Sequence, residues 1–143
     1  MVMSLSFELA GEPRGKGRPR FSSRGGFVKT YTDAKTRDYE TRIREAARKA
    51  MDAAGLEPTD RPVSVRIVMA SCPPISWSKK RRLAALLGQE LPKKPDLDNV
   101  AKCVLDALNN VVYQDDVQVW RLVVTKLYAG DASLSVEILE RGE

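Results

Sequence analysis

The chain has no histidine and only two cysteines, Cys72 and Cys103, among its 143 residues. Without histidine there can be no Ser-His-Asp triad, no Cys-His nucleophile pair and no nuclease site built on histidine. Two cysteines cannot complete a Cys/His zinc finger. Any catalysis must therefore depend on carboxylates, lysine, arginine, tyrosine or a bound metal ion. Structural disulfides are uncommon inside cells, so we predict that both cysteines are buried small residues.

Long hydrophobic runs are also absent. No segment approaches the roughly 20 apolar residues of a membrane span. The start of the chain contains Glu8 and no positive charge, unlike a signal peptide. We therefore expect a soluble, cytoplasmic protein without a membrane partner. A chain of this length fits one domain, residues 1–143, that buries roughly two thirds of its unfolded surface.

Acidic residues are outnumbered, because 24 lysines and arginines face 19 aspartates and glutamates and give a net charge of +5. Such a surplus favours a polyanionic partner. It is concentrated in residues 11–29, where glycine and proline prevent a regular element, and we predict an extended or mobile basic arm there. The candidate DNA-binding residues of this arm are Arg14, Lys16, Arg18 and Arg20.

The start of the basic arm, Gly11 to Gly17, invites comparison with a phosphate-binding P-loop. It is one residue short between its glycines, and it lacks the serine or threonine that follows the lysine and holds magnesium. We therefore predict no nucleotide cofactor.

Hydrophobic periodicity predicts the remaining elements, with period two in strands and three to four in helices. It predicts strands at 4–9 and 62–70, helices at 32–54 and 100–108, a short helix from Ser76 or Ser78 to Leu87, and a β-hairpin of 117–129 and 132–139 about Gly130-Asp131. Thr32 or Asp33 is expected to cap the first helix and Gly55 to end it, and Gly88 is expected to end the short helix. This order indicates an α+β domain whose mixed sheet carries helices mainly on one face.

The short helix begins with four cations, Lys79, Lys80, Arg81 and Arg82. Positive charge at a helix N-terminus opposes the helix dipole. Two interpretations remain open. One is a solvated face, the ordinary use of a charge run, and the other is a phosphate-binding patch that acts with the basic arm.

Four aspartates and a lysine within 21 residues form the most informative group: Asp96, Asp98, Lys102, Asp115 and Asp116. Carboxylate oxygens are the ligands that Mg²⁺ prefers, completed by water and substrate phosphates. An aspartate before a helix is also an ordinary cap, and Asp98 fits that role. If the chain returns so that Asp115 or Asp116 lies beside the helix N-terminus, three carboxylates meet there and require a cation between them.

Lys102 follows Asp98 by one helical turn and is predicted to share its face. Its ordinary role is an ion pair worth a few tenths of a kcal/mol, ~0.2–0.5. Its functional role is to orient an attacking water or to stabilise charge on a reacting phosphate. An amine of ordinary pKa is protonated at pH 7 and is therefore a poor base.

Several aromatic residues lie outside the basic arm, among them Trp77, Trp120, Tyr113 and Tyr128. Such rings can stack on unpaired bases. Their positions in predicted strand and helix segments favour core packing instead.

The residues around the acidic group resemble the RusA Holliday junction resolvases, small phage- and prophage-associated endonucleases. The resemblance covers nearly the whole chain. It rests on Asp96-Leu97-Asp98-Asn99, Lys102, Asp106-Ala107-Leu108 and Asp115-Asp116, and on the stretches Gly15 to Phe21 and Lys35 to Glu40. It implies a small, dimerising α+β domain of RusA type in a bacterial or phage-infected cell.

By this resemblance, Asp96, Asp98 and Asp116 are the catalytic metal-binding carboxylates, Lys102 is the catalytic lysine, and Asp115 is an accessory metal-binding acid. The family's substrate is the four-way DNA junction, which is cut symmetrically near the crossover in a Mg²⁺-dependent reaction. The segment between Asp98 and Asp115 is one residue shorter than in a well-known member. The choice between Asp115 and Asp116 therefore stays open.

Together these features predict an endodeoxyribonuclease that uses Mg²⁺, with Mn²⁺ as a substitute, and resolves four-way junctions by paired nicks with 5′-phosphate products in recombination and repair. A two-fold symmetric junction favours a C2 homodimer with one site per subunit. Backbone binding by the cationic segments should depend steeply on salt. Two alternatives remain: a non-catalytic branched-DNA-binding protein, whose aspartates are caps or surface residues, and a general metal-dependent nuclease that also cuts linear duplex.

Overall fold

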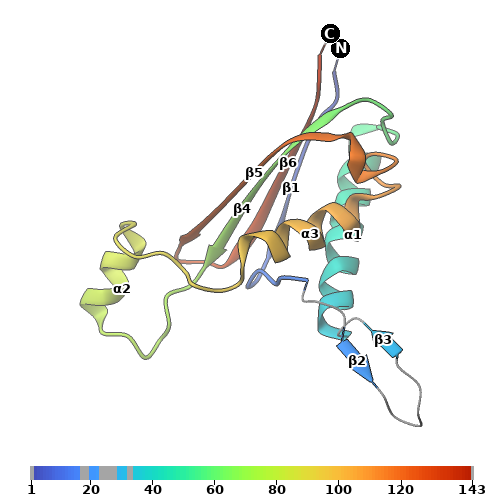
Figure 1. Cartoon of the computed structure of the whole chain (residues 1–143). Coiled ribbons are helices and arrows are strands. Elements are labelled where there is room, and N and C mark those ends of the chain that lie inside the picture. The colour runs from blue at the N-terminus through green and yellow to red at the C-terminus, as the bar shows by residue number, and fades with distance from the viewer. Residues whose placement is uncertain (1, 17–19, 23–28, 32–33, 143) are drawn as a thin grey trace.

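The computed structural model describes residues 2–16, 20–22, 29–31 and 34–142, with the backbone alone at 20–22 and 29–31. Its elements are, in chain order, β1 (Ser4–Ala10), β2 (Arg20–Ser22), β3 (Lys29–Tyr31), α1 (Ala34–Ala54), β4 (Val63–Ser71), α2 (Lys79–Leu86), α3 (Leu97–Leu108), the short 3-10 helix η2 (Asp116–Gln118), β5 (Val119–Tyr128) and β6 (Ser133–Glu140). Figure 1 shows their arrangement.

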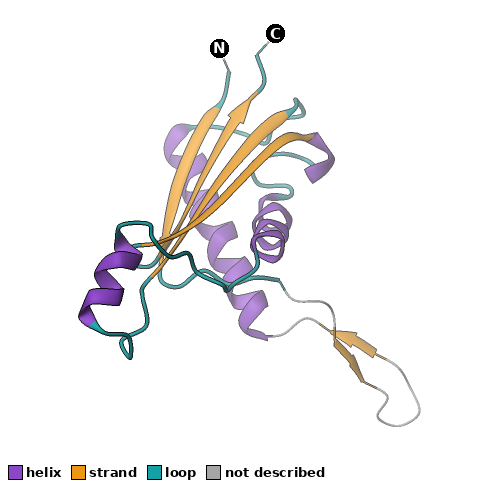
Figure 2. Ribbon diagram, turned by 60° about the vertical axis from the view of Figure 1, so that its left-hand side comes forward, coloured by secondary structure: helices purple, strands orange, loops and turns teal. Residues whose placement is uncertain are grey.

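A mixed four-stranded sheet with the order β1-β6-β4-β5 forms the centre of the fold. Strand β6 runs antiparallel to both β1 and β4, whereas β5 runs parallel to β4. Helices α1 and α3 pack against each other and cover one face of the sheet, and α2 stands at the end of the sheet opposite the chain termini (Figures 1 and 2). The predicted α+β fold with helices mainly on one face is confirmed.

The core lies between this sheet face and the two long helices. Alternation in β4 points one set of side chains toward the helices, and these are at most 1% exposed: Val63, Val65, Ile67 and Met69. The facing stripe of α3 is also buried, namely Val100, Ala101, Cys103, Val104, Ala107 and Leu108. Burial of these aliphatic groups, at about 25 cal/mol per Å² of apolar surface, fixes α3 against the sheet.

The predicted hairpin of 117–129 and 132–139 is wrong in its pairing, although both strands exist. Strand β4 lies between β5 and β6. The turn carries the chain across the end of β4, where the Ala129 amide donates a 2.9 Å hydrogen bond to the Ser71 carbonyl. The inner face of β6 is fully buried, which suits an interior strand, whereas β5 is exposed along much of its length, which suits an edge.

The predicted irregular arm contains one regular element. Strands β2 and β3 pair antiparallel, with Arg20 opposite Tyr31, and Figure 2 shows this ribbon separate from the main sheet. Residues 17–19 and 23–28 lie outside the described residues, as do the predicted caps of α1, Thr32 and Asp33. The expectation of no regular element between residues 11 and 29 is therefore wrong for the short β2 strand.

Both predicted helix stops are confirmed, because Gly55 and Gly88 adopt φ values of +65° and +85° after α1 and α2. The Ser78 side chain caps α2 by accepting a 3.1 Å hydrogen bond from the Arg81 amide. Of the two caps proposed for this helix, Ser78 rather than Ser76 therefore occupies the cap position.

Burial corrects two further predictions. Cys103 is fully buried as predicted, but Cys72 is exposed. Tyr113 belongs to the core, whereas Trp120 keeps 52% of its surface exposed and Trp77 is half-buried. No helix among the described residues has the length and apolar character needed to cross a membrane.

Candidate active site

Helix α3 begins at Leu97, three residues earlier than predicted, and Asp96 occupies its N-cap position. The Asp96 side chain makes no capping hydrogen bond to the helix backbone. Asp98 lies inside the first turn, so the alternative interpretation in which Asp98 caps the helix is wrong. Both carboxylates are exposed, and the first-turn position is one where the helix dipole favours negative charge.

The two carboxylates share Asn99 as a neighbour. Asp98 Oδ1 accepts a 3.0 Å hydrogen bond from the Asn99 amide, and Asp96 Oδ2 accepts a 3.4 Å hydrogen bond from Asn99 Nδ2. Carboxylates that do not cap a helix and that remain exposed keep lone pairs for a ligand. Capping therefore does not account for this acidic pair.

The start of the basic arm docks on the same turn of α3. The Lys16 amide donates a 2.8 Å hydrogen bond to the Asn99 carbonyl. Next to it, a Cβ atom at Gly15 would lie 2.6 Å from Asn99 Cβ, closer than real side chains approach. Gly15 is thus required for the arm to contact α3 this closely.

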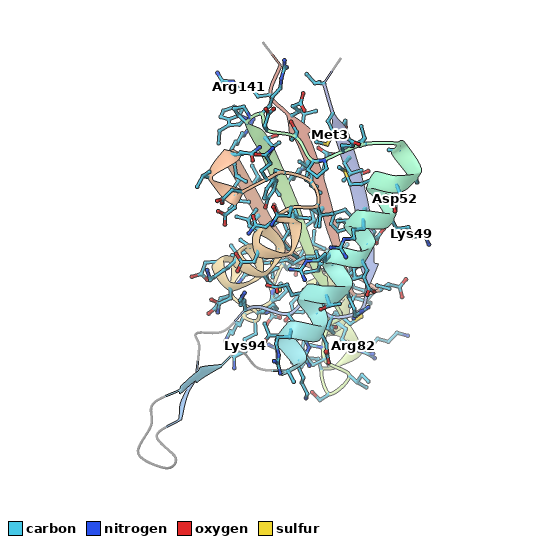
Figure 3. All side chains as sticks on the ribbon, turned by 90° about the vertical axis from the view of Figure 1, so that its right-hand side faces the viewer. Met3, Lys49, Asp52, Arg82, Lys94 and Arg141 are labelled. Atoms are coloured by element: carbon cyan, nitrogen blue, oxygen red, sulfur yellow. The ribbon has the colours of Figure 1, made fainter. Side chains whose placement is uncertain are left out.

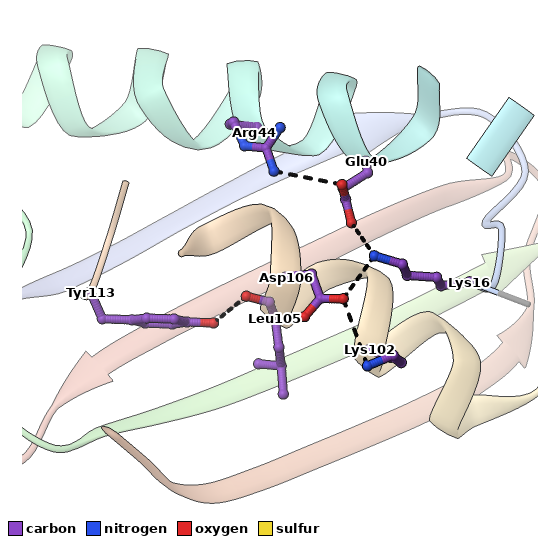
Figure 4. A network of polar contacts seen from close by, with 7 residues as sticks. All are labelled: Lys16, Glu40, Arg44, Lys102, Leu105, Asp106 and Tyr113. Atoms are coloured by element: carbon purple, nitrogen blue, oxygen red, sulfur yellow. Dashed lines mark hydrogen bonds and ion pairs between the residues drawn. The ribbon is translucent and has the colours of Figure 1, made fainter. Parts of the chain in front are cut away.

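Lys16 is held by acidic side chains from two helices (Figure 4). Its ammonium group lies 2.9 Å from Asp106 Oδ2 on α3 and 3.0 Å from Glu40 Oε1 on α1. Arg44 approaches the other oxygen of Glu40 at 3.6 Å. Burial lowers the pKa of Lys16, but the hydrogen bonds with Asp106 and Glu40 outweigh burial and leave it raised. Lys16, predicted to bind DNA, is thus already paired within the protein.

Lys102 shares Asp106 with Lys16. Its Nζ atom lies 3.9 Å from Asp106 Oδ2, and its side chain is 63% exposed. The long distance and the exposure describe a loose ion pair. The Lys102 ammonium group is therefore free to move toward a ligand beside Asp98, one turn away on the same helix.

Asp115 and Asp116 follow a compact turn that leads away from α3. Within it, the buried Tyr113 hydroxyl donates a 2.7 Å hydrogen bond to the Leu105 carbonyl, and this bond ties the turn to the helix. Burial raises the pKa of Tyr113, and the negative charges of Asp116, Asp106 and Asp115 raise it further. The hydroxyl therefore stays protonated and remains a hydrogen-bond donor.

Asp115 and Asp116 have different roles in η2. Asp115 is the N-cap residue and accepts a 3.3 Å hydrogen bond from the Val117 amide. Gln118 completes this capping box by accepting from the Asp115 amide at 3.0 Å. Gln118 also donates to the carbonyls of Thr59 and Arg61, which anchors η2 to the loop before β4. The Asp115 side chain thus serves as a helix cap, whereas the Asp116 side chain does not.

Asp116 lies in a negative environment. A hydrogen bond with Asp115 raises the pKa of the Asp116 carboxyl, and burial and the charges of Asp115 and Asp106 add to the increase, whereas Lys102 lowers it. A carboxyl with a raised pKa beside other acids is a position where a cation would relieve repulsion. Sequence spacing did not reveal that Asp106 belongs to this environment.

Asp96, Asp98 and Asp116 fit Mg²⁺ by their chemistry, because all three are hard oxygen donors. Among the residues that the structure describes, however, no three acidic or cysteine side chains lie close enough to hold one ion together. The predicted convergence of three carboxylates at the helix N-terminus is therefore not formed among the described residues. The α3 residues whose charges act on Asp116 are Asp106 and Lys102. Asp106 is eight residues along α3 from Asp98, or roughly 12 Å.

The lysines and arginines predicted to bind DNA differ in their exposure and in whether they are already paired within the protein. Lys79 and Lys80 are exposed, and Arg82 is partly buried. Arg82 and Lys94 lie at the end of the molecule opposite Met3 and Arg141 (Figure 3). Arg81 contacts Glu90 at 2.6 Å and 3.1 Å. Arg14 is exposed, Arg18 lies outside the described residues, and only the backbone is described for Arg20.

Comparison with known proteins gives the same family as the sequence resemblance. The family described as "Endodeoxyribonuclease RusA" matches residues 10–139. The chain is also 36% identical over 138 residues to "Uncharacterized protein YqaN" of Bacillus subtilis (strain 168), covering 95% of this chain and 96% of the relative. This protein therefore belongs to the RusA endodeoxyribonuclease family, a family of nucleases that act on DNA junctions.

Proposed function

We propose that this protein is a Mg²⁺-dependent endonuclease that resolves four-way DNA junctions by paired symmetric nicks during recombination and repair. The observation that carries the proposal is the pair of exposed carboxylates, Asp96 and Asp98, at the start of α3, neither of which caps the helix. A nuclease without histidine needs such a pair, because carboxylates can position a metal ion and its water.

In the proposed mechanism, Asp96 and Asp98 would hold the metal from α3. Asp116 of η2, which in this structure lies beside Asp106 and not at the helix N-terminus, would become a third ligand only when η2 moves toward that end of α3 as metal and DNA bind. Asp116 is preferred to Asp115 because the Asp115 side chain serves as the cap of η2. When bound, Mg²⁺ activates water and neutralises charge on the reacting phosphate, and Mn²⁺ can substitute. The Lys102 ammonium group would stabilise the same negative charge. Attack of water on phosphorus would break the P–O3′ bond, and the released 3′ oxygen would take up a proton, so that the products are a 5′-phosphate and a 3′-hydroxyl.

We also propose that the active form is a homodimer joined along β5. This edge strand exposes large apolar side chains, with Trp120 52%, Leu122 41% and Val123 38% exposed. An exposed apolar edge strand is a template for pairing with a second chain. A two-fold dimer supplies one site for each of two matched cuts. Trp120→Glu should convert the dimer to a monomer in sedimentation velocity, whereas the matched control Ser6→Glu, on the opposite edge strand β1, should not.

Cleavage of a mobile four-way junction and of a linear duplex of the same sequence tests the catalytic proposal. Wild-type protein in Mg²⁺ should give paired nicks confined to the junction, and EDTA should abolish them. Asp98→Asn should bind the junction without cutting it. Glu137→Gln, which removes an exposed carboxylate on the helix-free face of the sheet, is the matched control and should cut normally.

Two other outcomes would replace this proposal. Equal cutting of the duplex would indicate a general metal-dependent nuclease. Junction binding without cleavage, together with a loss of folding stability in Asp96→Asn and Asp98→Asn, would indicate a structural DNA-binding protein whose aspartates stabilise α3.

A further inference from the structure

The segment between β4 and α3 borders an open cavity of about 540 Å³ that the proposed catalytic chemistry does not use. Its lining comes from α2, from the ends of β4 and β5 and from the loop before α3. This volume is within the range of small-molecule binding sites. Its walls combine aromatic and cationic side chains, among them Trp77, Arg81, Lys93, Lys94 and Tyr128.

The aromatic wall is built from two rings in contact. Trp77 and Tyr128 meet edge to face with their ring centroids 5.6 Å apart. The Arg81 guanidinium lies over the Trp77 ring, 3.5 Å from its centroid, and Glu90 holds it through two hydrogen bonds. Half of the Arg81 side chain remains exposed. A fixed guanidinium plane on an indole is a platform on which another flat ring can stack.

The charge around the cavity is positive. Lys93 and Lys94 line it and are exposed. Lys79 and Lys80 lie on the adjoining turn of α2 and are also exposed. Glu90 is already neutralised by Arg81, and the Glu12 side chain accepts a hydrogen bond from the Cys72 amide. A flat, anionic, partly apolar ligand matches these walls, and a nucleotide within a DNA strand has this chemistry.

The cavity is also close to the proposed cleavage site along the chain. Lys94 lines it, and Asp96 follows two residues later. Two residues span at most roughly 7 Å, while successive nucleotides in one strand of a duplex are about 3.4 Å apart. A base held in the cavity would therefore belong to a nucleotide a few positions from the bond that is cut.

We infer that this cavity captures one unstacked nucleobase of the DNA substrate, which stacks against the Trp77–Arg81 platform while Lys93 and Lys94 contact the flanking phosphates. This inference rests on the proposed nuclease function. It gives that function a source of selectivity, because removing a base from a stack costs least where the base is unpaired or its stacking is interrupted. Bases at a junction crossover meet that condition, and bases within a linear duplex do not.

Two single-tryptophan proteins test the inference directly, because the chain has only Trp77 and Trp120. Trp120→Phe leaves Trp77 as the sole fluorophore, and Trp77→Phe leaves Trp120. Each is titrated with a four-way junction in EDTA, so that no cleavage occurs. We expect strong quenching of Trp77 by the junction, weak quenching by linear duplex, and little change of Trp120. Unchanged Trp77 fluorescence at saturating junction overturns the inference.

Cleavage by Trp77 variants provides the second readout. Trp77→Leu should lower the ratio of junction to duplex cutting by about tenfold, on the scale of one base stacked on an aromatic ring. Trp77→Phe, which keeps a ring, should retain most of that ratio, and circular dichroism checks that both variants fold. If the wild-type protein resolves junctions and Trp77→Leu resolves them with the same selectivity, the cavity proposal fails and the nuclease proposal stands. If Trp77 is quenched but wild-type protein does not cut, the nuclease proposal fails alone.

Discussion

Lys16 of the basic arm and Asp106 of α3 form a hydrogen-bonded ion pair of 2.9 Å, and the same carboxylate oxygen lies 3.9 Å from Lys102. Asp106 therefore sits between the lysine that anchors the arm and the lysine proposed to act in catalysis. Because Lys16 occupies the closer position, Lys102 is held only loosely. The position of the arm and the mobility of Lys102 are thus linked through one carboxylate.

The first prediction concerns a substitution of Lys16, the lysine that anchors the arm. Lys16→Met leaves Glu40 and Asp106 without their shared partner, and we expect a loss of about 1–2 kcal/mol in the free energy of unfolding. It also lets Asp106 draw Lys102 closer, so cleavage should slow while DNA binding changes less. Urea unfolding and single-turnover cleavage measure the two effects. Lys49→Met, an exposed lysine on α1, is the matched control and should change neither.

A double substitution separates these effects. Adding Asp106→Asn to Lys16→Met removes the charge that captures Lys102, so the cleavage rate should partly recover although stability does not. No recovery would mean that Lys16 affects cleavage only through the position of the arm.

The second prediction concerns the close contact of Gly15. In Gly15→Ala the new Cβ would meet Asn99 Cβ at 2.6 Å, so either the arm or α3 must shift, at a cost of roughly 1–3 kcal/mol. Gly130→Ala is the control, because its Cβ would meet nothing within 4 Å. Thermal unfolding should show a loss for Gly15→Ala alone. The added substitution Asn99→Gly removes the opposing Cβ atom and should relieve the clash, although it weakens the helix itself.

Local patterns predicted much of this fold. The alternation of Val63, Val65 and Ile67 identified β4, and the positions of Gly55 and Gly88 identified two helix ends, because both signals depend on neighbouring residues alone. The pairing of β5 and β6 depends instead on which strand buries a complete face, a property of the whole sheet. A turn at Gly130 shows that the chain reverses, but not which strand it pairs with next.

The acidic residues and the lysine of the candidate site were chosen from the sequence, and their roles stay a prediction; the sequence did not predict which of them lie together. Spacing placed Asp98 and Lys102 on one face of a helix, because that relation is local. The contact of Lys16 with Asp106 spans 90 residues, and no periodic pattern records it. The separation of Asp115 as a cap from Asp116 depends on the backbone of η2 and on Gln118, which spacing between acidic residues could not reveal.

The third prediction follows from the buried thiol on α3. Burial raises the pKa of Cys103 from 9.0 to about 12, and the charge of Glu40 adds to the increase. In the unfolded chain the thiol ionises near pH 9, whereas in the folded protein it stays protonated. Its contribution to stability is therefore complete below pH 9 and is lost as the pH rises toward 12. Tyr39, whose burial raises its pKa from 10.0 to about 12, acts in the same direction.

Urea unfolding between pH 7 and pH 11 would measure this loss, which should not exceed about 1.4 kcal/mol per pH unit for each group. In Cys103→Ala the curve should start lower at neutral pH, because a buried side chain is shortened, but should fall less steeply above pH 9. At pH 8 a thiol reagent should modify the exposed Cys72 quickly and Cys103 only on unfolding. Equal rates would contradict the packing of α3.

The last prediction tests the role of the Lys102 ammonium group. If Lys102 stabilises negative charge on the reacting phosphate, a permanent cation can replace it, and Lys102→Arg should keep cleavage within about tenfold of wild type. Lys102→Met removes the charge and should slow cleavage roughly 100- to 1,000-fold, the cost of losing one such stabilising group. Junction binding by both variants in EDTA provides the control for affinity.

The pH dependence distinguishes charge stabilisation from proton transfer. Arginine cannot act as a base near neutral pH, because its side chain stays protonated. If Lys102 accepts the proton from water, Lys102→Arg should be as inactive as Lys102→Met, and the wild-type rate should rise with pH as more of the free amine forms. If it provides charge, the wild-type and arginine proteins should have parallel pH profiles between pH 7 and 9. The loose pairing with Asp106 favours the second result, because it leaves the Lys102 ammonium group free to reach the phosphate.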